Sequence, residues 1–342
     1  MYKHGNSPFN PYERILIAKI TQIIYNIYNI YHIMNFLSIV VPCFNEEESI
    51  ELFFKEVQKE LSDYDYEIIF INDGSSDNTL KSIKEISKSN SNIKYISFSR
   101  NFGKESAIYA GLKNASGDLI CIMDADLQHP PNLLPIMIKT ISDKDCDVVA
   151  ARRVSRKGEP TIKSFFARLF YKFFNKISEM NLKEGATDYR MMTRQVADSI
   201  LELTEFNRFT KGLFNWVGFD TEWIDYENVE RAVGETTWSY WGLIKYSVEG
   251  IVAFSTAPLS ISTLLGAIFS IVAFIYMLYI IIKYLLYSDP VQGFATIMCA
   301  ILLLGGIQLL SIGVLGTYLE KTYIETKKRP IFIVKESNID EK

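Results

Sequence analysis

Five short, nearly continuous apolar segments alternate with segments of helical pattern, and this alternation constrains the fold more than any other feature of the chain. The apolar segments are 36–44 (FLSIVVPCF), 66–73 (YEIIFIND), 93–99 (IKYISFS), 118–125 (DLICIMDA) and 146–153 (CDVVAARR). Such β-branched runs are typical of strands buried on both faces of a sheet. Helices are expected between them at 46–61, 77–89, 103–114 and 131–142. The pattern predicts an α/β fold with a mainly parallel sheet and right-handed crossovers.

Polar residues follow nearly every predicted strand. Ligands of such sheets bind outside the carboxyl ends of the strands, so these positions form the candidate site. They are Asn45, Glu46, Asp73, Gly74, Ser75, Arg100, Asn101, Asp124 and Asp126. The sequence has no GxGxxG after the first strand and no GxxxxGK[ST], so it indicates neither a dinucleotide fingerprint nor a P-loop.

Two carboxylates one residue apart, Asp124 and Asp126, follow the fourth predicted strand. Alternate residues of an extended chain point to the same side, so both can face one ligand. Paired hard oxygens suit Mg²⁺ or Mn²⁺, which would neutralise charge on a departing nucleoside diphosphate. The alternative is that Asp126 only caps the turn that follows. We interpret His129 as a structural turn residue.

Charge and cysteine usage exclude several classes. The formal net charge is −4 and no basic block dominates the chain, so nothing favours nucleic-acid binding. The four cysteines lie far apart without CxxC or Cys/His spacing, which disfavours a zinc site and a disulfide framework. We expect them to be reduced, buried thiols.

Four motifs in order resemble a known family: VPCFNEEES, FINDGSSDNT, RNFGKESA and MDADLQHPP. They are similar to family 2 glycosyltransferases of the GT-A fold, inverting enzymes that use nucleotide sugars. Closer still are the polyprenyl-phosphate glycosyltransferases, which include dolichol-phosphate mannose synthases and, nearest, the bacterial bactoprenol glucosyltransferases. The resemblance continues through GATDYRMM, RFTKGLFNWVGF and YIETKKRPIFIV, and only the first 33 residues lie outside it.

The resemblance implies roles for individual residues. The nucleotide pocket would be lined by Pro42, Asn45, Glu46, Asp73, Lys104 and Asp124. The metal site would be formed by Asp124, Asp126 and the amide oxygen of Gln128. Asp188 is the candidate for contacting sugar hydroxyls or assisting the nucleophile, and its neighbour Arg190 for holding a phosphate; Asp188 could also be a turn residue. Together with Asp126 they form the predicted catalytic set. Glu47 and Glu48 are interpreted as first-turn helix carboxylates.

Two long apolar segments, 258–282 and 294–317, are each long enough to cross a bilayer, which requires about 20 residues. The link between them is too short to fold, so they are expected to form a helical hairpin. Basic residues flank its outer ends, which favours a cytoplasmic catalytic domain and C-terminus. Close helix contacts between subunits are suggested by Gly305, Gly306, Gly313 and Gly316.

Segment 161–177 combines aromatic and basic residues in a pattern typical of an in-plane interfacial helix, with a core helix that has a solvated basic face as the alternative. Arginines near a membrane surface can clamp a lipid phosphate with two hydrogen bonds. By resemblance, Arg153, Arg156 and Arg168 would bind the acceptor phosphate. A nonspecific basic patch that attracts anionic lipids is the alternative.

These features divide the chain into five parts. They are an N-terminal extension (1–33), a GT-A glycosyltransferase domain (34–230), a juxtamembrane amphipathic helix (231–256), two transmembrane helices (257–320) and a cytoplasmic C-terminal tail (321–342).

The expected function is inverting transfer of a hexose from a nucleotide sugar to the phosphate of undecaprenyl phosphate at the bacterial inner membrane. The donor is expected to be UDP-glucose, or else UDP-N-acetylglucosamine, and the cofactor Mg²⁺ or Mn²⁺. A homo-oligomer, a tetramer by resemblance, and a downstream flippase and second glycosyltransferase are expected partners. The alternatives are a processive polysaccharide synthase, which would need more spans and a QxxRW element absent here, and a non-enzymatic membrane subunit.

Overall fold

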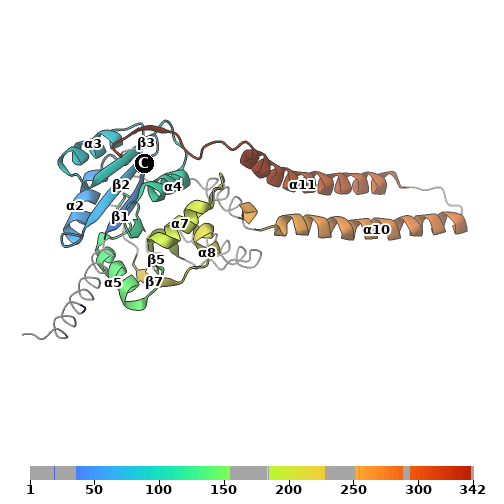
Figure 1. Ribbon diagram of the computed structural model, residues 1–342. Coiled ribbons are helices and arrows are strands. Elements are labelled where there is room, and N and C mark those ends of the chain that lie inside the picture. The colour runs from blue at the N-terminus through green and yellow to red at the C-terminus, as the bar shows by residue number, and fades with distance from the viewer. Residues whose placement is uncertain are drawn as a thin grey trace, which may run out of the picture.

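The structure is a computed structural model, shown in Figure 1. It describes Lys19, 36–154, Lys183, 185–227, 251–253, 255–287 and 293–339. Several sequence predictions lie outside these residues. They are the extension at 1–33 apart from Lys19, the interfacial helix at 161–177, Arg156, Arg168 and most of the juxtamembrane helix at 231–256.

The described residues form one sheet of eight strands in the order β7-β5-β6-β4-β1-β2-β3-β8. The strands are β1 (Leu37–Cys43), β2 (Tyr66–Asn72), β3 (Ile93–Phe98), β4 (Leu119–Ile122), β5 (Val148–Arg153), β6 (Ala186–Thr193), β7 (Thr221–Tyr226) and β8 (Val334–Ser337). The first five coincide with the five apolar runs of the sequence. The predicted α/β fold is therefore confirmed.

Parallel pairing joins β1 to β2 and β4, β2 to β3, and β5 to β7. Strand β6 lies between β4 and β5 and runs antiparallel to both. Strand β8 runs antiparallel to β3 at the edge of the sheet. The sheet is thus parallel at its centre, and the antiparallel β6 places the start of that strand at the carboxyl ends of its neighbours.

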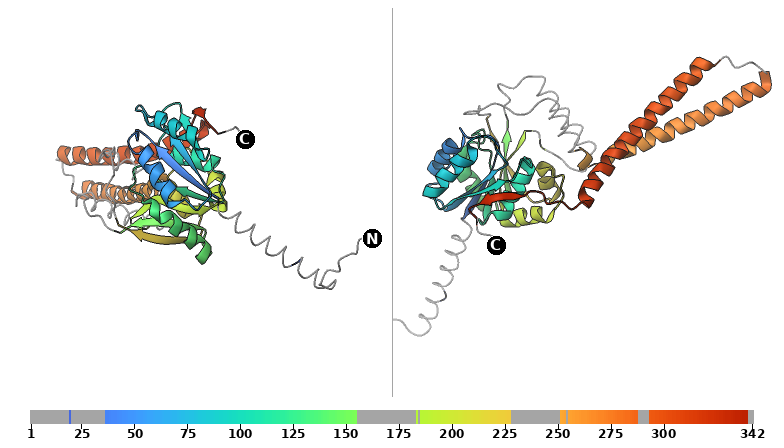
Figure 2. Two further views of the ribbon diagram at one scale, coloured as in Figure 1. Left: turned by 90° about the vertical axis from the view of Figure 1, so that its left-hand side faces the viewer. Right: turned by 90° about the horizontal axis from the view of Figure 1, so that it is seen from above.

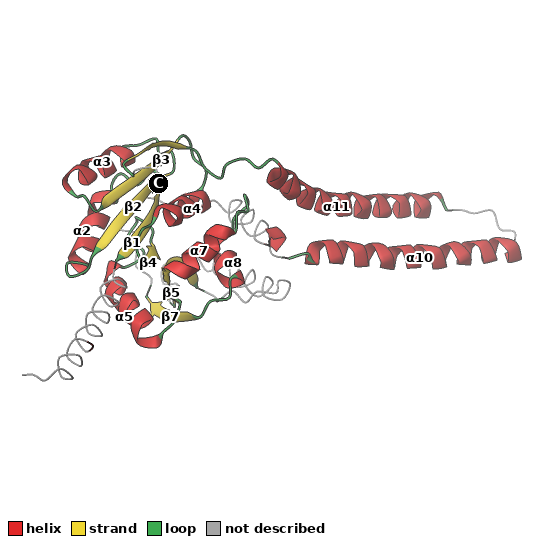
Figure 3. Ribbon diagram, viewed as in Figure 1, coloured by secondary structure: helices red, strands yellow, loops and turns green. Residues whose placement is uncertain are grey.

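Helices cover both faces of the sheet (Figure 3). Strand β1 shows why, because alternate residues point to opposite faces: Ile39 joins one buried cluster and Val40 the other. The first face packs against α2 (Ile50–Glu60), α3 (Thr79–Ser89), the short η1 (Pro131–Leu133) and α5 (Leu134–Lys144). The second packs against α4 (Lys104–Asn114), α7 (Arg194–Glu202) and α8 (Thr210–Trp216).

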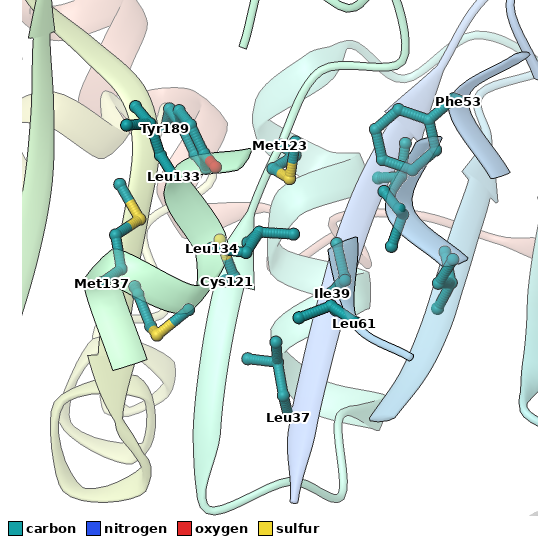
Figure 4. Close-up of a cluster of buried hydrophobic side chains, with 14 of the residues drawn as sticks. Leu37, Ile39, Phe53, Leu61, Cys121, Met123, Leu133, Leu134, Met137 and Tyr189 are labelled. Carbon is teal, nitrogen blue, oxygen red and sulfur yellow. The ribbon is translucent and has the colours of Figure 1, made fainter. Parts of the chain in front are cut away.

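Figure 4 shows the core of the first face. Leu37 and Ile39 of β1 belong to one buried cluster with Phe53 of α2, Met137 of α5 and Tyr189 of β6, and four of these five side chains are completely buried, with Leu37 1% exposed. Burying a large apolar side chain contributes roughly 1.5–3 kcal/mol relative to leaving it exposed. The core thus holds β1 and β6 in fixed positions.

Helix α4 approaches β1 closely. A Cβ atom added at Gly111 would lie 2.1 Å from Cγ1 of Val40. Glycine is therefore required sterically here, and it sets the distance between β1 and the helix that begins at Lys104.

Two long helices, α10 (Ala257–Tyr287) and α11 (Phe294–Thr326), run side by side and extend away from the α/β domain (Figures 1 and 2). Both are long and apolar enough to cross a membrane, and none of the described side chains in their apolar windows is buried. The predicted hairpin is present. The structure extends its second helix to Thr326, past the predicted span.

The chain after α11 returns to the sheet. Strand β8 pairs with β3, with Ser337 opposite Ile96, and Phe332 stacks on Phe98 with ring centroids 4.9 Å apart. The sequence pattern of the tail does not predict this strand, since four residues are too few for a recognisable period. Part of the predicted tail thus belongs to the sheet.

Candidate active site

The three predicted catalytic or metal-binding carboxylates lie at the same edge of the sheet. Asp124 and Asp126 follow β4, and Asp188 lies near the start of β6. Because β4 and β6 are antiparallel, Ile122 at the end of β4 pairs with Arg190. The residues before Arg190 therefore reach the carboxyl edge, and Asp188 is a strand residue rather than a turn residue.

Lys104, the first residue of α4, bridges two of these carboxylates. Its Nζ lies 2.6 Å from Oδ1 of Asp124 and 2.9 Å from Oδ2 of Asp188. Burial opposes the charged form of Lys104, but the two carboxylates outweigh it and raise its pKa. Burial would raise the pKa of each carboxyl, yet the ammonium group of Lys104 lowers both. All three groups are therefore charged at neutral pH.

His129 holds the backbone of Asp124 in place through a hydrogen bond. Its Nδ1 accepts the backbone N–H of Asp124 at 3.0 Å, and its ring stacks on Tyr189 with centroids 5.0 Å apart. The Tyr189 hydroxyl in turn donates to the Pro130 carbonyl at 3.1 Å. Burial lowers the pKa of His129, which favours the neutral ring that this acceptor role requires. His129 is a structural residue, as interpreted, and it also positions a candidate ligand.

Asp126 is buried, with 4% of its surface exposed, and accepts the backbone N–H of Gln128 at 3.1 Å. Leu127 between them has φ +60°, which makes a tight turn. Asp126 therefore caps the turn through one hydrogen bond, as the alternative interpretation predicts. This hydrogen bond does not prevent Asp126 from also binding a metal ion. Among the described residues no group of three Asp, Glu, His or Cys side chains is arranged to hold a metal ion alone.

The chemistry of Asp124 and Asp126 nevertheless fits a magnesium or manganese ion. Mg²⁺ is usually held by one or two carboxylates together with substrate phosphates and water, rather than by an all-protein cage. A site of two carboxylates meets that description. The role of the Gln128 amide as a third ligand stays a prediction.

Asp73 anchors the loop that leads into α4. Its two carboxylate oxygens accept the backbone N–H groups of Phe102 at 2.6 Å and Gly103 at 2.9 Å. Burial raises the pKa of Asp73, and these hydrogen bonds only partly oppose that rise. The contact of Asp73 with the base and ribose stays a prediction. In the structure Asp73 fixes the residues that precede Lys104.

The loop after β1 is tied to the loop after β2. Asn45, with φ +55°, accepts the N–H of Ser76 at 2.9 Å through Oδ1. Glu46 donates its N–H to Thr79 Oγ1 at 2.8 Å. Pro42 lies within β1 opposite Ile71. Asn45, Glu46 and Pro42 are therefore at the same edge as Asp124, where a nucleotide pocket is predicted.

The interpretation of Glu47 as a first-turn carboxylate of its own helix is wrong. Helix α2 begins at Ile50, and residues 46–49 form a turn. Glu47 instead accepts the backbone N–H of Asn78 at 2.7 Å, directly before α3. Its charge stabilises the start of the neighbouring helix, a contact that sequence spacing cannot reveal.

Arg190 is buried beneath the site. Its guanidinium lies 4.0 Å from the ring centroid of Phe214 in α8, and Nη2 donates to the Thr187 carbonyl at 3.0 Å. It contributes to the lowered pKa of Asp188, as does Lys211. Of the predicted acceptor arginines, only Arg153 is described, as the last residue of β5.

Sequence reasoning missed three residues near this cluster. Glu105 accepts the N–H of Thr210 at 2.9 Å and also its hydroxyl group, and Lys211 follows Thr210 at the start of α8. A Lys-Glu pair that opens a helix looks like ordinary surface charge, so the sequence carried no signal for Glu105. The arrangement as a whole offers carboxylates and cations at one sheet edge, which is suited to binding a phosphorylated ligand with a divalent ion.

Comparison with known proteins agrees with this geometry. The profile of Glycosyl transferase family 2 matches residues 38–201. Putative glycosyltransferase CsbB of Bacillus subtilis (strain 168) is 44% identical over 308 residues, covering 90% of this chain and 93% of the relative. The prophage bactoprenol glucosyl transferase homolog of Escherichia coli (strain K12) is 44% identical over 301 residues, covering 87% and 98%.

A third relative, the bactoprenol glucosyl transferase of Shigella phage SfII, is 42% identical over 304 residues, covering 88% of this chain and 98% of the relative. Each of the three alignments covers 87–90% of this chain and 93–98% of the relative. The protein therefore belongs to glycosyl transferase family 2 and is a glycosyltransferase with a GT-A domain, as the sequence resemblance implied.

Proposed function

We propose that the protein transfers glucose from UDP-glucose to the phosphate of undecaprenyl phosphate, with UDP-N-acetylglucosamine as the next candidate donor. The observation that carries the proposal is the cluster of Lys104, Asp124 and Asp188 at the carboxyl edge, in a chain that also has two exposed apolar helices. The names of the two bactoprenol glucosyl transferase relatives support the same acceptor and sugar.

Asp124 and Asp126 are the residues that would hold Mg²⁺ or Mn²⁺. When bound, the ion would neutralise negative charge on the diphosphate of the departing nucleotide. Lys104 would contribute a further positive charge on the same side of the ligand. Asn45, Glu46 and Asp73 would shape the nucleotide pocket beside it.

The acceptor needs little activation. A phosphomonoester is largely dianionic at neutral pH, since its second pKa is about 6. One of its oxygens would bond to the anomeric carbon while the bond from that carbon to the diphosphate oxygen breaks, and the electron pair leaves with UDP. A single displacement of this kind inverts the anomeric centre, and positioning of both substrates is the main requirement.

Asp188 is better suited to binding than to general base catalysis. Lys104 and Lys211 hold its pKa below the usual range despite burial, so it takes up a proton weakly at neutral pH. We therefore propose that it accepts hydrogen bonds from hydroxyl groups of the sugar. Arg153, with Arg156 and Arg168, would bind the acceptor phosphate in a bidentate manner.

The two apolar helices would place the enzyme in the bacterial inner membrane, with the α/β domain on the cytoplasmic side. The start of α10 and the end of α11 lie at the end of the hairpin nearest the α/β domain, and basic residues such as Lys327 and Lys328 follow α11. This orientation can be tested with cysteines introduced into α5 and labelled in intact cells. If the domain were periplasmic, these cysteines would be labelled without permeabilisation of the cells.

A product made on the cytoplasmic side would require a flippase and a second glycosyltransferase outside. The glycines of α11 suggest a homo-oligomer, such as a tetramer, and crosslinking in native membranes that yields only monomer would contradict it. A processive synthase has no support among the described residues, because they include only two helices able to span a membrane. The non-enzymatic alternative disagrees with the family.

The test uses purified full-length protein in detergent with UDP-glucose, UDP-N-acetylglucosamine or GDP-mannose, and with Mg²⁺, Mn²⁺ or a chelator. Release of nucleoside diphosphate should require undecaprenyl phosphate and a divalent ion, and should be fastest with UDP-glucose. Faster release from another donor would mean that the enzyme transfers a different sugar, while the proposed reaction type would still hold. No lipid-dependent release with any donor would contradict the proposal.

A further inference from the structure

The end of α11 nearest the α/β domain carries two polar side chains that bind that domain. Oε1 of Glu325 accepts the backbone N–H groups of Phe206 at 2.9 Å and Asn207 at 3.3 Å. One turn earlier, Nζ of Lys321 donates to Oδ1 of Asn207 at 3.0 Å. Residues four apart lie on the same face of a helix, so Lys321 and Glu325 act together on one segment.

That segment, 206–210, is packed against α4. The guanidinium of Arg208 lies 4.6 Å from the ring centroid of Tyr109 and donates to the carbonyls of Leu203 and, at 3.3 Å, Ile200. Thr210 is buried, and both its backbone N–H and its hydroxyl group donate hydrogen bonds to Oε2 of Glu105. The segment therefore spans the distance between α11 and the first turn of α4.

The first turn of α4 is the part of the helix that reaches the active site. Glu105 directly follows Lys104, whose Nζ holds Asp124 and Asp188. A second connection runs through α8, which begins at Thr210 and places Phe214 beneath the guanidinium of Arg190, two residues after Asp188. Both connections start at segment 206–210.

The chain beyond α11 contacts the same helix. Phe332 packs edge to face on Tyr109 with centroids 6.4 Å apart, while stacking on Phe98 of β3. Tyr109 is thus contacted by Arg208, which lies on the segment held by α11, and by Phe332, which follows α11. Segment 206–210, which α11 holds, and the chain that follows α11 therefore both contact α4 through Tyr109.

We propose that Lys321 and Glu325 are positioning residues for glycosyl transfer, which hold segment 206–210 against α4 so that Lys104 stays between Asp124 and Asp188. The inference rests on the proposed function, because it assigns the second membrane helix a part in the reaction besides anchoring. Neither residue touches substrate. Their effect passes through Thr210, Glu105 and Lys104.

The experiment compares full-length Glu325→Ala, Glu325→Gln and Lys321→Met with the wild type in lipid nanodiscs. Ala removes the acceptor of the Phe206 and Asn207 N–H groups, whereas Gln keeps a carbonyl oxygen at the same place. Glu320→Ala is the matched control, because Glu320 is exposed on the same helix. The measured quantities are kcat, KM for the sugar donor, the melting temperature and hydrogen exchange of the backbone N–H groups.

We expect Glu325→Ala to lower kcat about tenfold with KM for the donor nearly unchanged, since small misplacement of catalytic groups acts on the reaction step. Lys321→Met should have a smaller effect in the same direction, and Glu325→Gln should restore most of the rate. An unchanged kcat with a lower melting temperature would overturn the proposal, as would an effect confined to KM.

Hydrogen exchange separates this proposal from the proposed function, because it needs no substrate. Glu325→Ala should speed exchange at Thr210 and in α8, as well as at Phe206 and Asn207. Faster exchange at Phe206 and Asn207 alone would overturn the coupling even if the enzyme transfers sugar. Failure of the wild type to transfer sugar would instead contradict the proposed function, while the exchange result would still decide the coupling.

Discussion

Lys104 and Asp188 are 84 positions apart in the chain, yet Nζ of Lys104 lies 2.9 Å from Oδ2 of Asp188. The contact exists because β6 runs antiparallel beside β4 and brings its first residues to the edge where α4 begins. The ion pair thus joins α4, which follows β3, to β6, which lies much later in the sequence. It is the centre of the proposed active site.

Replacing Lys104 by Met should lower kcat/KM for transfer about 100-fold, a loss typical of removing one preorganised charge from an active site. The pKa values of Asp124 and Asp188 should rise, because each carboxyl loses its shared counter-charge. Lys113→Met, in the exposed last turn of the same helix, is the control and should keep the wild-type rate. A Lys104→Met enzyme within about threefold of the wild type would contradict this role.

Gly111→Ala should destabilise the α/β domain by about 1–3 kcal/mol, as is usual for an overpacked core. The added Cβ would meet Cγ1 of Val40 at 2.1 Å and push α4 away from β1. Combining it with Val40→Ala should recover part of the loss in melting temperature. Losses that simply add in the double variant would show that this contact is not the cause.

A buried carboxylate at the opposite end of the strands should control acid stability. Glu67 is 1% exposed and accepts hydrogen bonds from the Ser38 hydroxyl at 2.5 Å and the Ser116 N–H at 2.7 Å. It also forms an ion pair with Lys94, whose Nζ lies 2.5 Å from Oε2. Burial alone would raise the pKa of Glu67, but Lys94, Ser38 and Ser116 lower it below the ordinary 4.5. The resulting stability is present above pH 4.5 and lost as the pH falls through the folded-state value.

Glu67→Gln should therefore lower stability at pH 7 by about 2 kcal/mol, the scale of hydrogen bonds to a charged group. The difference between the melting temperatures of the variant and the wild type should shrink as the pH falls below 4.5. Thermal unfolding measured from pH 7 down to pH 3 provides the comparison. A difference that is independent of pH would mean that ionised Glu67 has no net stabilising effect.

The sequence predicts the centre of the sheet well and its periphery poorly. Strands β1 to β5 have nearly continuous apolar runs because most of their residues are buried, and these runs identify them directly. Strand β6, with the sequence ATDYRMMT, is half polar at its start because it carries active-site residues. Its place between β4 and β5 depends on pairing with distant strands, which local periodicity does not encode.

The candidate site shows the same limit. Asp124 and Asp126 can be found from the sequence because they follow an unmistakable strand. The contact between Lys104 and Asp188 cannot, since it depends on where β6 enters the sheet. The sequence indicates that His129 is a structural residue, but its hydrogen bond with the Asp124 backbone is visible only in the folded turn.

Detection of the product itself tests the proposed reaction most directly. Full-length protein, UDP-glucose, undecaprenyl phosphate and Mg²⁺ or Mn²⁺ are incubated, and the lipid fraction is analysed by mass spectrometry for undecaprenyl-phosphate glucose. Asp126→Asn is measured beside it, because Asn keeps an acceptor for the Gln128 N–H but loses the charge. Asp143→Asn on the exposed side of α5 is the control.

We expect a lipid-linked hexose with the wild type and with Asp143→Asn, and at least about 100-fold less with Asp126→Asn. The product should also disappear when the divalent ion is chelated. A hexose-lipid formed at the wild-type rate by Asp126→Asn, or no such lipid from the folded wild-type protein with any nucleotide sugar, would contradict it.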